Sequence, residues 1–255
     1  PLENSFQFGG LRGPAQSLQS FADRRIRCFV LRERFVQRLG NMCGRSAIME
    51  RAARQVGKIA CFYVIGREGE DRAARGEQFD GLVVEGGEGG GFKNPQDVAT
   101  MVLLPLIASK VSLPIIAAGG ICDGVSMAAA FALGAEGVQM GTRMVSAAES
   151  PVHDNWKNSI INGAETGTVF LNRLSRPGLR ALRTERTTAL EKQDHVPLTE
   201  MSRALDLYFG GDMEAAIALT GQVMGRIEAI KPVQEIIYET IAELRSVISG
   251  LASAI

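Results

Sequence analysis

The chain has 255 residues, of which 45% are hydrophobic and 22% are charged, so a largely disordered protein is excluded. Its 28 Lys and Arg residues balance its 28 Asp and Glu residues. Positions 1–60 hold 11 basic and 4 acidic residues, but they contain no recognition motif for nucleic acid. No apolar run is long enough to span a membrane. We therefore expect one large α/β domain or two smaller ones that bind neither membrane nor nucleic acid.

Four cysteines are scattered along the chain without a C-x-x-C pair, and only two histidines are present. This combination argues against a zinc site and is typical of a reducing compartment, so we expect a cytoplasmic protein without a metal. The first residue is Pro1 rather than methionine, which indicates that the sequence starts inside a longer gene.

From residue 59 onward, apolar strand-like runs that end in glycine alternate with helix-like segments, which favours βαβ units and a parallel sheet. The predicted strands are 59–64, 81–85, 114–118, 137–142 and 168–171. The predicted helices between them are 68–77, 98–110 with Asp97 as its cap, 125–133 with Gly134 as its C-cap, and 156–163.

The last 60 residues are predicted to be helical. Helices are expected at 197–208, 213–220 and 222–230, followed by an amphipathic helix at 233–251 whose apolar stripe packs on the domain or contacts a second copy in a homodimer. The chain is thus divided into a divergent or truncated segment 1–57, a partial barrel 58–195 and C-terminal helices 196–255.

Two of the strands run directly into glycine. The strand at 114–118 continues into Gly119 and Gly120, and the next strand ends at Gly141 and Thr142. Glycine lets backbone N–H groups approach a ligand closely, and a helix start beyond it favours an anion. We call these two glycine-containing strand ends, at Gly119–Gly120 and at Gly141–Thr142, the glycine exits. Two such exits, one βα unit apart, predict a phosphate site; the alternative is that these glycines only form tight βα turns.

Residues 83–91, 114–124 and 132–143 resemble the nitronate monooxygenase (2-nitropropane dioxygenase) family, which includes enoyl-acyl-carrier-protein reductase II. Residues 221–225 and 230–233 resemble its C-terminal helices. The resemblance covers about residues 58–250 and implies an FMN-dependent (β/α)₈ TIM barrel acting on a small-molecule substrate. It implies an FMN site formed by Gly119, Gly120, Gly141 and Thr142 at the phosphate, with Ala118, Gln139 and Met140 beside them, Gly90 and Gly91 against the isoalloxazine ring, and Gln222 from the tail.

One position departs from the family. Many members have a histidine directly after the Gly-Gly of this run, where this chain has Phe92, which cannot move a proton. Abstraction of a proton from a neutral nitroalkane is therefore not expected, whereas oxidation of an ionised nitronate, or hydride transfer from NAD(P)H, needs no base there. Glu85 and Glu88 are the nearest acids, and Glu85, at the end of a buried strand, is a weak candidate for contact with cofactor or substrate.

Other polar residues have less specific interpretations. Arg176, Arg180 and Arg183 are expected on one face of a helix after Pro177, where they pair with nearby acids such as Glu185 or meet a pyridine-nucleotide phosphate. His153 is expected at the surface at a helix start, and Cys122 in a turn, as a small residue or a reactive thiol.

The number of strands is too small for a complete barrel. A (β/α)₈ barrel needs eight strands, five are predicted, and the residues before position 59 are too few for three more units. We expect first strands that are missing or divergent. The functions compatible with the sequence are a nitronate monooxygenase-like enzyme, an NAD(P)H-dependent reductase of a quinone or enoyl thioester, a sugar-phosphate isomerase or aldolase, and an inactive remnant.

Overall fold

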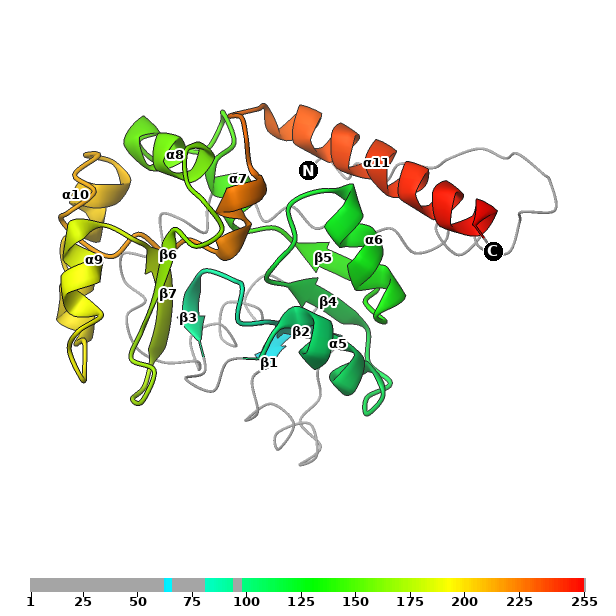
Figure 1. Cartoon of the computed structure of the whole chain (residues 1–255), viewed down its shortest axis with the longest axis horizontal. Helices are drawn as coiled ribbons and strands as arrows, with labels where there is room; N and C mark the ends of the chain where they lie inside the picture. The colour runs from blue at the N-terminus through cyan, green and yellow to red at the C-terminus, as the bar shows by residue number, and fades with distance from the viewer. Residues whose placement is uncertain (1–61, 66–80, 94–97, 255) are drawn as a thin grey trace, which may run out of the picture.

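A computed structural model describes residues 62–65, 81–93 and 98–254, and Figure 1 shows how their elements are arranged. A four-stranded sheet has the strand order β1-β2-β4-β5, with every pair of neighbours parallel. This confirms the predicted parallel sheet. Its strands are β1 (Phe62–Ile65), β2 (Gly81–Glu85), β4 (Ile115–Ala118) and β5 (Gly137–Gln139).

Two helices connect these strands and lie against the sheet, α5 (Thr100–Ala108) and α6 (Gly124–Ala132). Helix α6 begins at a reciprocal cap, in which the Asp123 carboxylate accepts from the Ser126 N–H at 2.8 Å. It ends before Gly134, whose φ of +104° places it in the left-handed region expected of a C-cap glycine. The predicted cap Asp97 of α5 and the predicted helix 68–77 lie outside the described residues.

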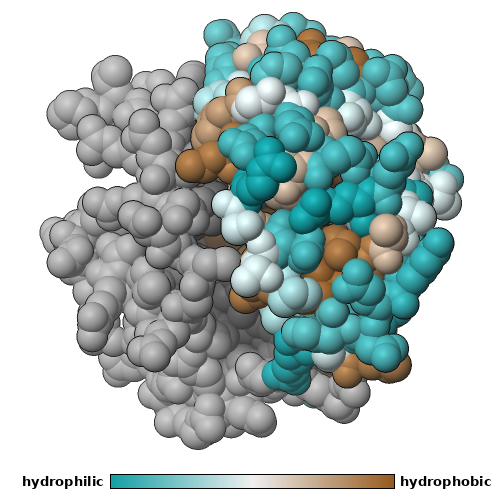
Figure 2. Space-filling model, turned by 90° about the vertical axis from the view of Figure 1, so that its left-hand side faces the viewer, coloured by the Kyte–Doolittle hydropathy of each residue, from teal (hydrophilic) through white to brown (hydrophobic). Residues whose placement is uncertain are grey.

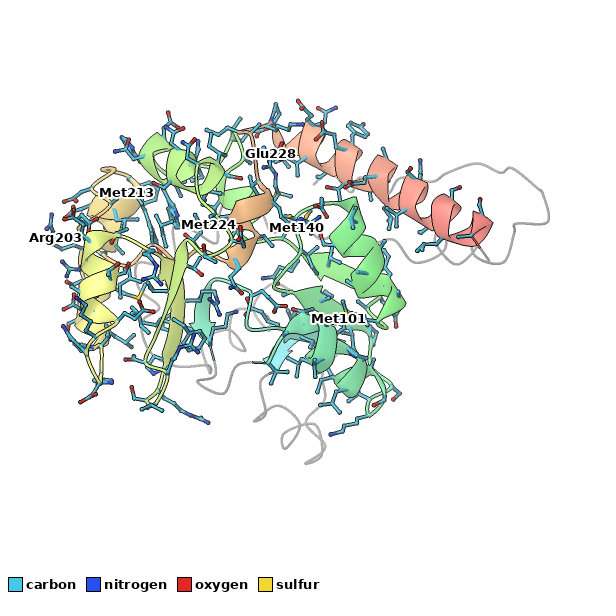
Figure 3. All side chains as sticks on the ribbon, in the orientation of Figure 1. Met101, Met140, Arg203, Met213, Met224 and Glu228 are labelled. Carbon is cyan, nitrogen blue, oxygen red and sulfur yellow. The ribbon has the colours of Figure 1, made fainter. Side chains whose placement is uncertain are left out.

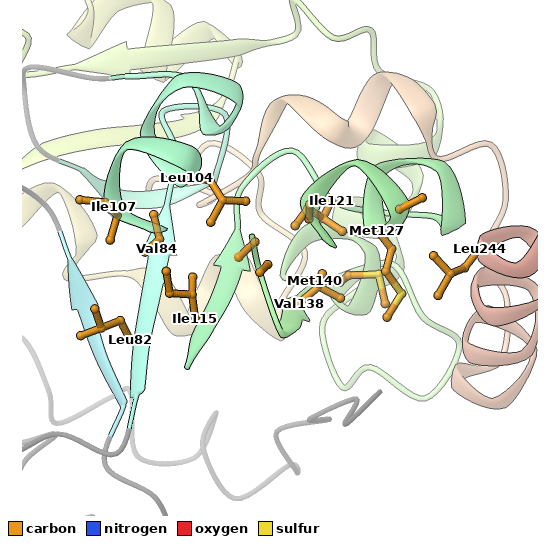
Figure 4. Close-up of a cluster of buried hydrophobic side chains, with 14 residues drawn as sticks. Leu82, Val84, Leu104, Ile107, Ile115, Ile121, Met127, Val138, Met140 and Leu244 are labelled. Atoms are coloured by element: carbon orange, nitrogen blue, oxygen red, sulfur yellow. The ribbon is translucent and has the colours of Figure 1, made fainter. Parts of the chain in front are cut away.

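The hydrophobic core lies between the sheet and these helices, and Figure 4 shows it in detail. The strands read as continuous apolar runs because both of their faces are covered, as is usual in parallel sheets. The completely buried members of the core are Leu82 and Val84 of β2, Leu104 of α5, Ala117 of β4 and Leu244 of the last helix.

The last helix, α11 (Val233–Ser253), packs on α6, as the amphipathic pattern predicts. The two backbones approach each other closely at Gly124, where a Cβ would lie 2.3 Å from the Leu244 nitrogen and 2.5 Å from the Thr240 oxygen. The Gly124 N–H also donates to Glu243 Oε2 at 2.7 Å. Gly124 therefore serves helix packing, although it belongs to the stretch that resembles a cofactor-binding motif.

We expect Leu244→Ala to lower the free energy of unfolding by about 2–5 kcal/mol, because it removes a completely buried side chain between α6 and α11. Leu251 lies on the same helix and is 59% exposed, so the matched control Leu251→Ala is expected to change stability by less than about 0.5 kcal/mol. Urea unfolding followed by circular dichroism measures both. Equal effects of the two substitutions would show that α11 does not pack through Leu244.

A second, three-stranded sheet was not predicted. It has the order β3-β7-β6, with both pairs antiparallel. The prediction that 168–171 continues the parallel series is therefore wrong, because this strand pairs with β7 instead. An apolar run buried on both faces does not reveal the direction of its partner. The three strands are β3 (Gly91–Lys93), β6 (Thr168–Leu171) and β7 (Gly178–Leu182).

The remaining described helices are short, and one predicted helix is absent. Residues 213–220 form a turn followed by irregular backbone that lies beside β7, where the Leu182 N–H donates to Ala218 O at 2.8 Å. Their four consecutive buried residues, 215–218, suit a segment enclosed on all sides rather than a surface helix. The short helices are α7 (Thr142–Val145), α8 (Asp154–Ile161), α9 (Glu185–Leu190), η2 (Leu198–Met201), α10 (Ala204–Tyr208) and η3 (Gln222–Arg226).

Hydrophilic side chains dominate the described part of the face that carries α9 and α10, as Figure 2 shows. Ion pairs such as Arg186–Glu200, at 2.5 Å, lie in this region. Within the described ranges, none of the helices combines the length and the apolar character needed to cross a bilayer.

Candidate functional site

The glycines that follow β4 lie at the edge of the sheet where the parallel strands end. Gly119 and Gly120 both have left-handed backbone, with φ of +80° and +78°, which glycine adopts without strain. A Cβ on Gly119 would lie 3.0 Å from Gly86 O, whereas for one on Gly120 the nearest described atoms, those of Glu88, would be 3.8 Å away. Gly119 is thus packed against a neighbouring loop, while Gly120 faces a less crowded space.

Gly141 and Thr142 follow β5, the parallel neighbour of β4, so they lie at the same edge of the sheet as the first pair of glycines. A Cβ on Gly141 would have no atom of the described residues within 4 Å, which leaves open space beside it in this part of the structure. The Thr142 hydroxyl accepts from the Gly221 N–H at 2.9 Å and keeps its own proton to donate. The predicted adjacency of the two segments is confirmed; their binding of a phosphate remains a prediction.

The loop between β2 and β3, residues 86–90, is called the glycine-rich loop below. Its glycines are needed mainly because other atoms come very close. A Cβ on Gly90 would lie 2.7 Å from the Gly221 nitrogen, and one on Gly86 would lie 2.4 Å from the Thr100 nitrogen. Gly91, with φ of +97°, follows as the first residue of β3. That Gly90 and Gly91 lie against a flavin ring stays a prediction.

The tail also meets this loop. The Gln222 N–H, at the start of η3, donates to Glu88 O at 2.9 Å, so Gln222 contacts the loop through its backbone. The two other predicted neighbours of the phosphate differ in burial: Gln139 is exposed at the end of β5, whereas Met140 is buried in the core. Figure 3 shows Met140 near α6 and Met224 on η3 in the middle of the molecule.

Glu88 has a structural role that the sequence did not show. Both of its carboxylate oxygens lie 3.0 Å from the Thr100 nitrogen, the first N–H of α5. A carboxylate at a helix N-terminus is stabilised by the unpaired N–H groups there. The Thr100 hydroxyl also donates to Gly119 O at 2.9 Å, which ties α5 to the glycine pair. Glu88 and Thr100 together replace the side-chain cap that Ala99 cannot provide.

Glu85 precedes the glycine-rich loop in the sequence, and Phe92 follows it. Phe92, at the position of the family histidine, is 49% exposed and pairs with Leu179 in the antiparallel sheet. Glu85 ends β2 beside Ala118, and its Oε1 lies 2.5 Å from Nζ of Lys93, whose side chain is 5% exposed. Burial lowers the pKa of Lys93, while the Glu85 carboxylate opposes this shift. Lys93 was missed in the sequence, where nothing distinguishes it from a surface lysine.

The prediction of a helix after Pro177 is wrong, since β7 spans these residues. Arg180 is buried in this strand, where its Nε donates to Gly87 O at 2.5 Å and one amino group donates to Thr168 Oγ1 at 3.2 Å. Arg183 pairs with Glu191 at 2.8 Å rather than with Glu185. Arg180 interrupts the apolar run at 178–182, so the sequence pattern did not indicate a strand there.

Two further residues have structural roles. His153 precedes α8, where its Nδ1 accepts from the Asn155 N–H at 3.1 Å, in agreement with the predicted helix start. Cys122 is buried, and desolvation together with the neighbouring Asp123 carboxylate raises the pKa of its thiol to about 12. The thiol is therefore protonated near neutral pH, which argues against a reactive cysteine.

Comparisons with known proteins agree with this arrangement. The family model described as nitronate monooxygenase matches residues 47–243. A Mycobacterium tuberculosis protein named (3aS,4S,5R,7aS)-5-hydroxy-7a-methyl-1-oxo-octahydro-1H-indene-4-carboxyl-CoA dehydrogenase is 44% identical over 115 residues, which are 44% of this chain and 32% of that protein. A Staphylococcus aureus "Probable nitronate monooxygenase" is 42% identical over 38% of this chain and 29% of its own length. The matches thus span about a third of these curated relatives.

Solved structures extend the similarity to the fold. The M276A mutant of FabK from Thermotoga maritima has a TM-score of 0.72 and 33% identity, covering 83% of this chain and 68% of that one. Nitroalkane oxidase from Streptomyces ansochromogenes, with a TM-score of 0.65 and 23% identity, covers 80% and 62% and supports the fold alone. These relatives are TIM-barrel flavoproteins, and the four parallel strands described here form part of a barrel of this kind. The segment predicted to be divergent or truncated, residues 1–57, lies outside the described residues. The chain belongs to the nitronate monooxygenase family.

Proposed function

We propose that this chain is an FMN-dependent oxidoreductase of the nitronate monooxygenase type, which oxidises alkyl nitronates with O₂. The observation that carries the proposal is the pair of glycine exits at adjacent parallel strand ends, within a chain of this family. The finer assignments, FMN as the flavin, the site residues and a cytoplasmic location, are parts of the same proposal. When bound, FMN would supply the redox chemistry.

The residues present fit the phosphate end of FMN. Gly119 and Gly120 have positive φ angles, which residues with a Cβ adopt only with strain. Among the described residues, no atom fills the space beside Gly141. Backbone N–H groups from both exits and the free proton of the Thr142 hydroxyl are suitable donors to a dianionic phosphate. The nearby Glu88 carboxylate would repel a phosphate. Both of its oxygens, however, accept from the N-terminus of α5, and this interaction offsets part of the repulsion.

The residues near the glycine-rich loop limit the chemistry. Phe92 provides no proton acceptor, and the Oε1 atom of Glu85 is engaged by Lys93. No described residue at this position therefore replaces the family histidine as a base. An alkyl nitronate is already ionised and needs no such base, so it suits this site better than the parent nitroalkane.

We expect the purified chain, after incubation with FMN and gel filtration, to show the visible absorption bands of bound flavin. Chromatography of the cofactor released by heat should identify FMN, and mixing with an alkyl nitronate in air should consume O₂. A chain that stays colourless would overturn the proposal. Bound FMN with oxidation of NAD(P)H by a quinone, but without turnover of nitronate, would favour the reductase instead.

A further inference from the structure

Lys93 and Glu85 form a buried ion pair that joins the two sheets. Glu85 is the last residue of β2 in the parallel sheet, and Lys93 is the last residue of β3 in the antiparallel sheet. Nζ of Lys93 lies 2.5 Å from Oε1 of Glu85, and the two side chains are 5% and 22% exposed. Apart from this ion pair, no hydrogen-bond partner of Nζ is found among the described residues. The ammonium group therefore depends on Glu85 for compensation of its charge.

The glycine-rich loop passes directly over this ion pair. A Cβ on Gly89 would lie 2.3 Å from Glu85 Oε1 and 2.6 Å from Lys93 Nζ. Glycine at this position thus lets the loop backbone rest on the paired charges. If the pair separates or either side chain changes its conformation, the surface that supports the loop changes as well.

The same loop is in contact with the proposed phosphate site. A Cβ on Gly119 would lie 3.0 Å from Gly86 O and 3.1 Å from the Gly89 nitrogen, and the Gly86 N–H donates to Ala118 O at 3.1 Å. The contacts therefore run from the ion pair through Gly89 to Gly119. We propose that Lys93 is a positioning residue: its charged ammonium group, paired with Glu85, holds the glycine-rich loop in the shape that keeps Gly119 ready to bind the phosphate of FMN.

This inference rests on the proposed function, and the charges around Lys93 make it sensitive to pH. Burial lowers the pKa of Lys93 from its ordinary 10.5, and Arg180 of β7 lowers it further, whereas Glu85 and Glu88 raise it. Between the lowered pKa and 10.5 the folded chain binds fewer protons at Lys93 than the unfolded chain does. The contribution of Lys93 to folding stability therefore becomes more favourable as the pH rises through this window. Binding of FMN should weaken in the same window, because the uncharged amine no longer pairs with Glu85.

The test is a titration of FMN, followed by quenching of its fluorescence, on the full chain and on the variants Lys93→Met, Lys93→Arg and Lys192→Met. We expect Lys93→Met to bind FMN about tenfold more weakly or worse, and Lys93→Arg to recover part of this loss because it restores the charge. Lys192 is exposed, so its Met variant should bind as the wild type does. In wild type, alkaline pH should weaken FMN binding without loss of thermal stability, and this dependence should be much smaller in Lys93→Met.

The outcomes separate this inference from the proposed function. A wild-type chain that binds no FMN overturns the proposed function. A wild type that binds FMN, together with a Lys93→Met variant that binds equally well, overturns only the role of Lys93. Should Lys93→Met fail to fold, the pH series on wild type decides, because FMN affinity that stays constant, or that changes only in parallel with stability, contradicts a positioning role for the charge.

Discussion

Replacing Gly120 with leucine is expected to abolish retention of FMN while leaving the helical content nearly unchanged. Gly120 has φ of +78°, where any residue with a Cβ is strained by about 1–2 kcal/mol. A Cβ at this position would lie 3.8 Å from Glu88, an ordinary van der Waals distance, so the Cβ itself fits. The rest of the leucine side chain would occupy the space beside the proposed phosphate site. Gel filtration after incubation with FMN, followed by an absorption spectrum, measures the loss.

The matched control for strain is Gly134→Ala. Gly134 also has positive φ, +104°, and its Cβ would lie 2.8 Å from Cβ of Ala108, but it follows α6 at the opposite end of the sheet from Gly120. We expect this variant to lose stability and to keep FMN. If Gly120→Leu retains stoichiometric FMN, the phosphate lies elsewhere; if both variants lose FMN, general destabilisation explains the effect.

The parallel part of the fold could be predicted because its physical signal is local. Residues in strands covered on both faces are apolar without alternation, as at 81–85 and 114–118, and glycine marks where each strand ends. The C-cap glycine of α6, Gly134, and the stripe of α11 are equally local, since a glycine after the last helical residue and the spacing of apolar residues can be read within a few positions.

The antiparallel sheet was not predicted because Arg180 interrupts the apolar run of β7, and because the pairing of β3 with β7 joins residues that are distant in the sequence. Buried Arg180 in β7 donates a hydrogen bond to Gly87, 93 positions earlier in the sequence. Lys93 is buried beside Glu85, with which it forms an ion pair. In the site, the positions of Gly119, Gly120, Gly141 and Thr142 followed from strand order, whereas the packing of the glycine-rich loop on Gly221 depends on how the tail returns to the sheet. Neither the sequence around the glycine-rich loop nor the sequence around Gly221 indicates that the two segments pack together.

The absence of a histidine at position 92 should make this chain selective for substrates that are already ionised. A general base typically contributes about 10²–10⁴-fold to a rate, so with bound FMN we expect pre-ionised nitronate to be oxidised faster than its parent nitroalkane by a factor of this order. Phe92→His should recover part of the nitroalkane rate and leave the nitronate rate nearly unchanged. Oxygen consumption at a pH where the nitroalkane stays neutral measures both rates.

Phe209 provides a matched control, since it is 46% exposed against 49% for Phe92 and follows α10, away from the glycine-rich loop. Phe209→His should leave both rates unchanged, so a gain seen only with Phe92→His assigns the new proton acceptor to the site. Equal wild-type rates on the two substrates would mean that another group takes the proton. Glu85 would then be the first residue to replace, and because Lys93 engages its Oε1, a catalytic role for Glu85 would require that ion pair to open during turnover.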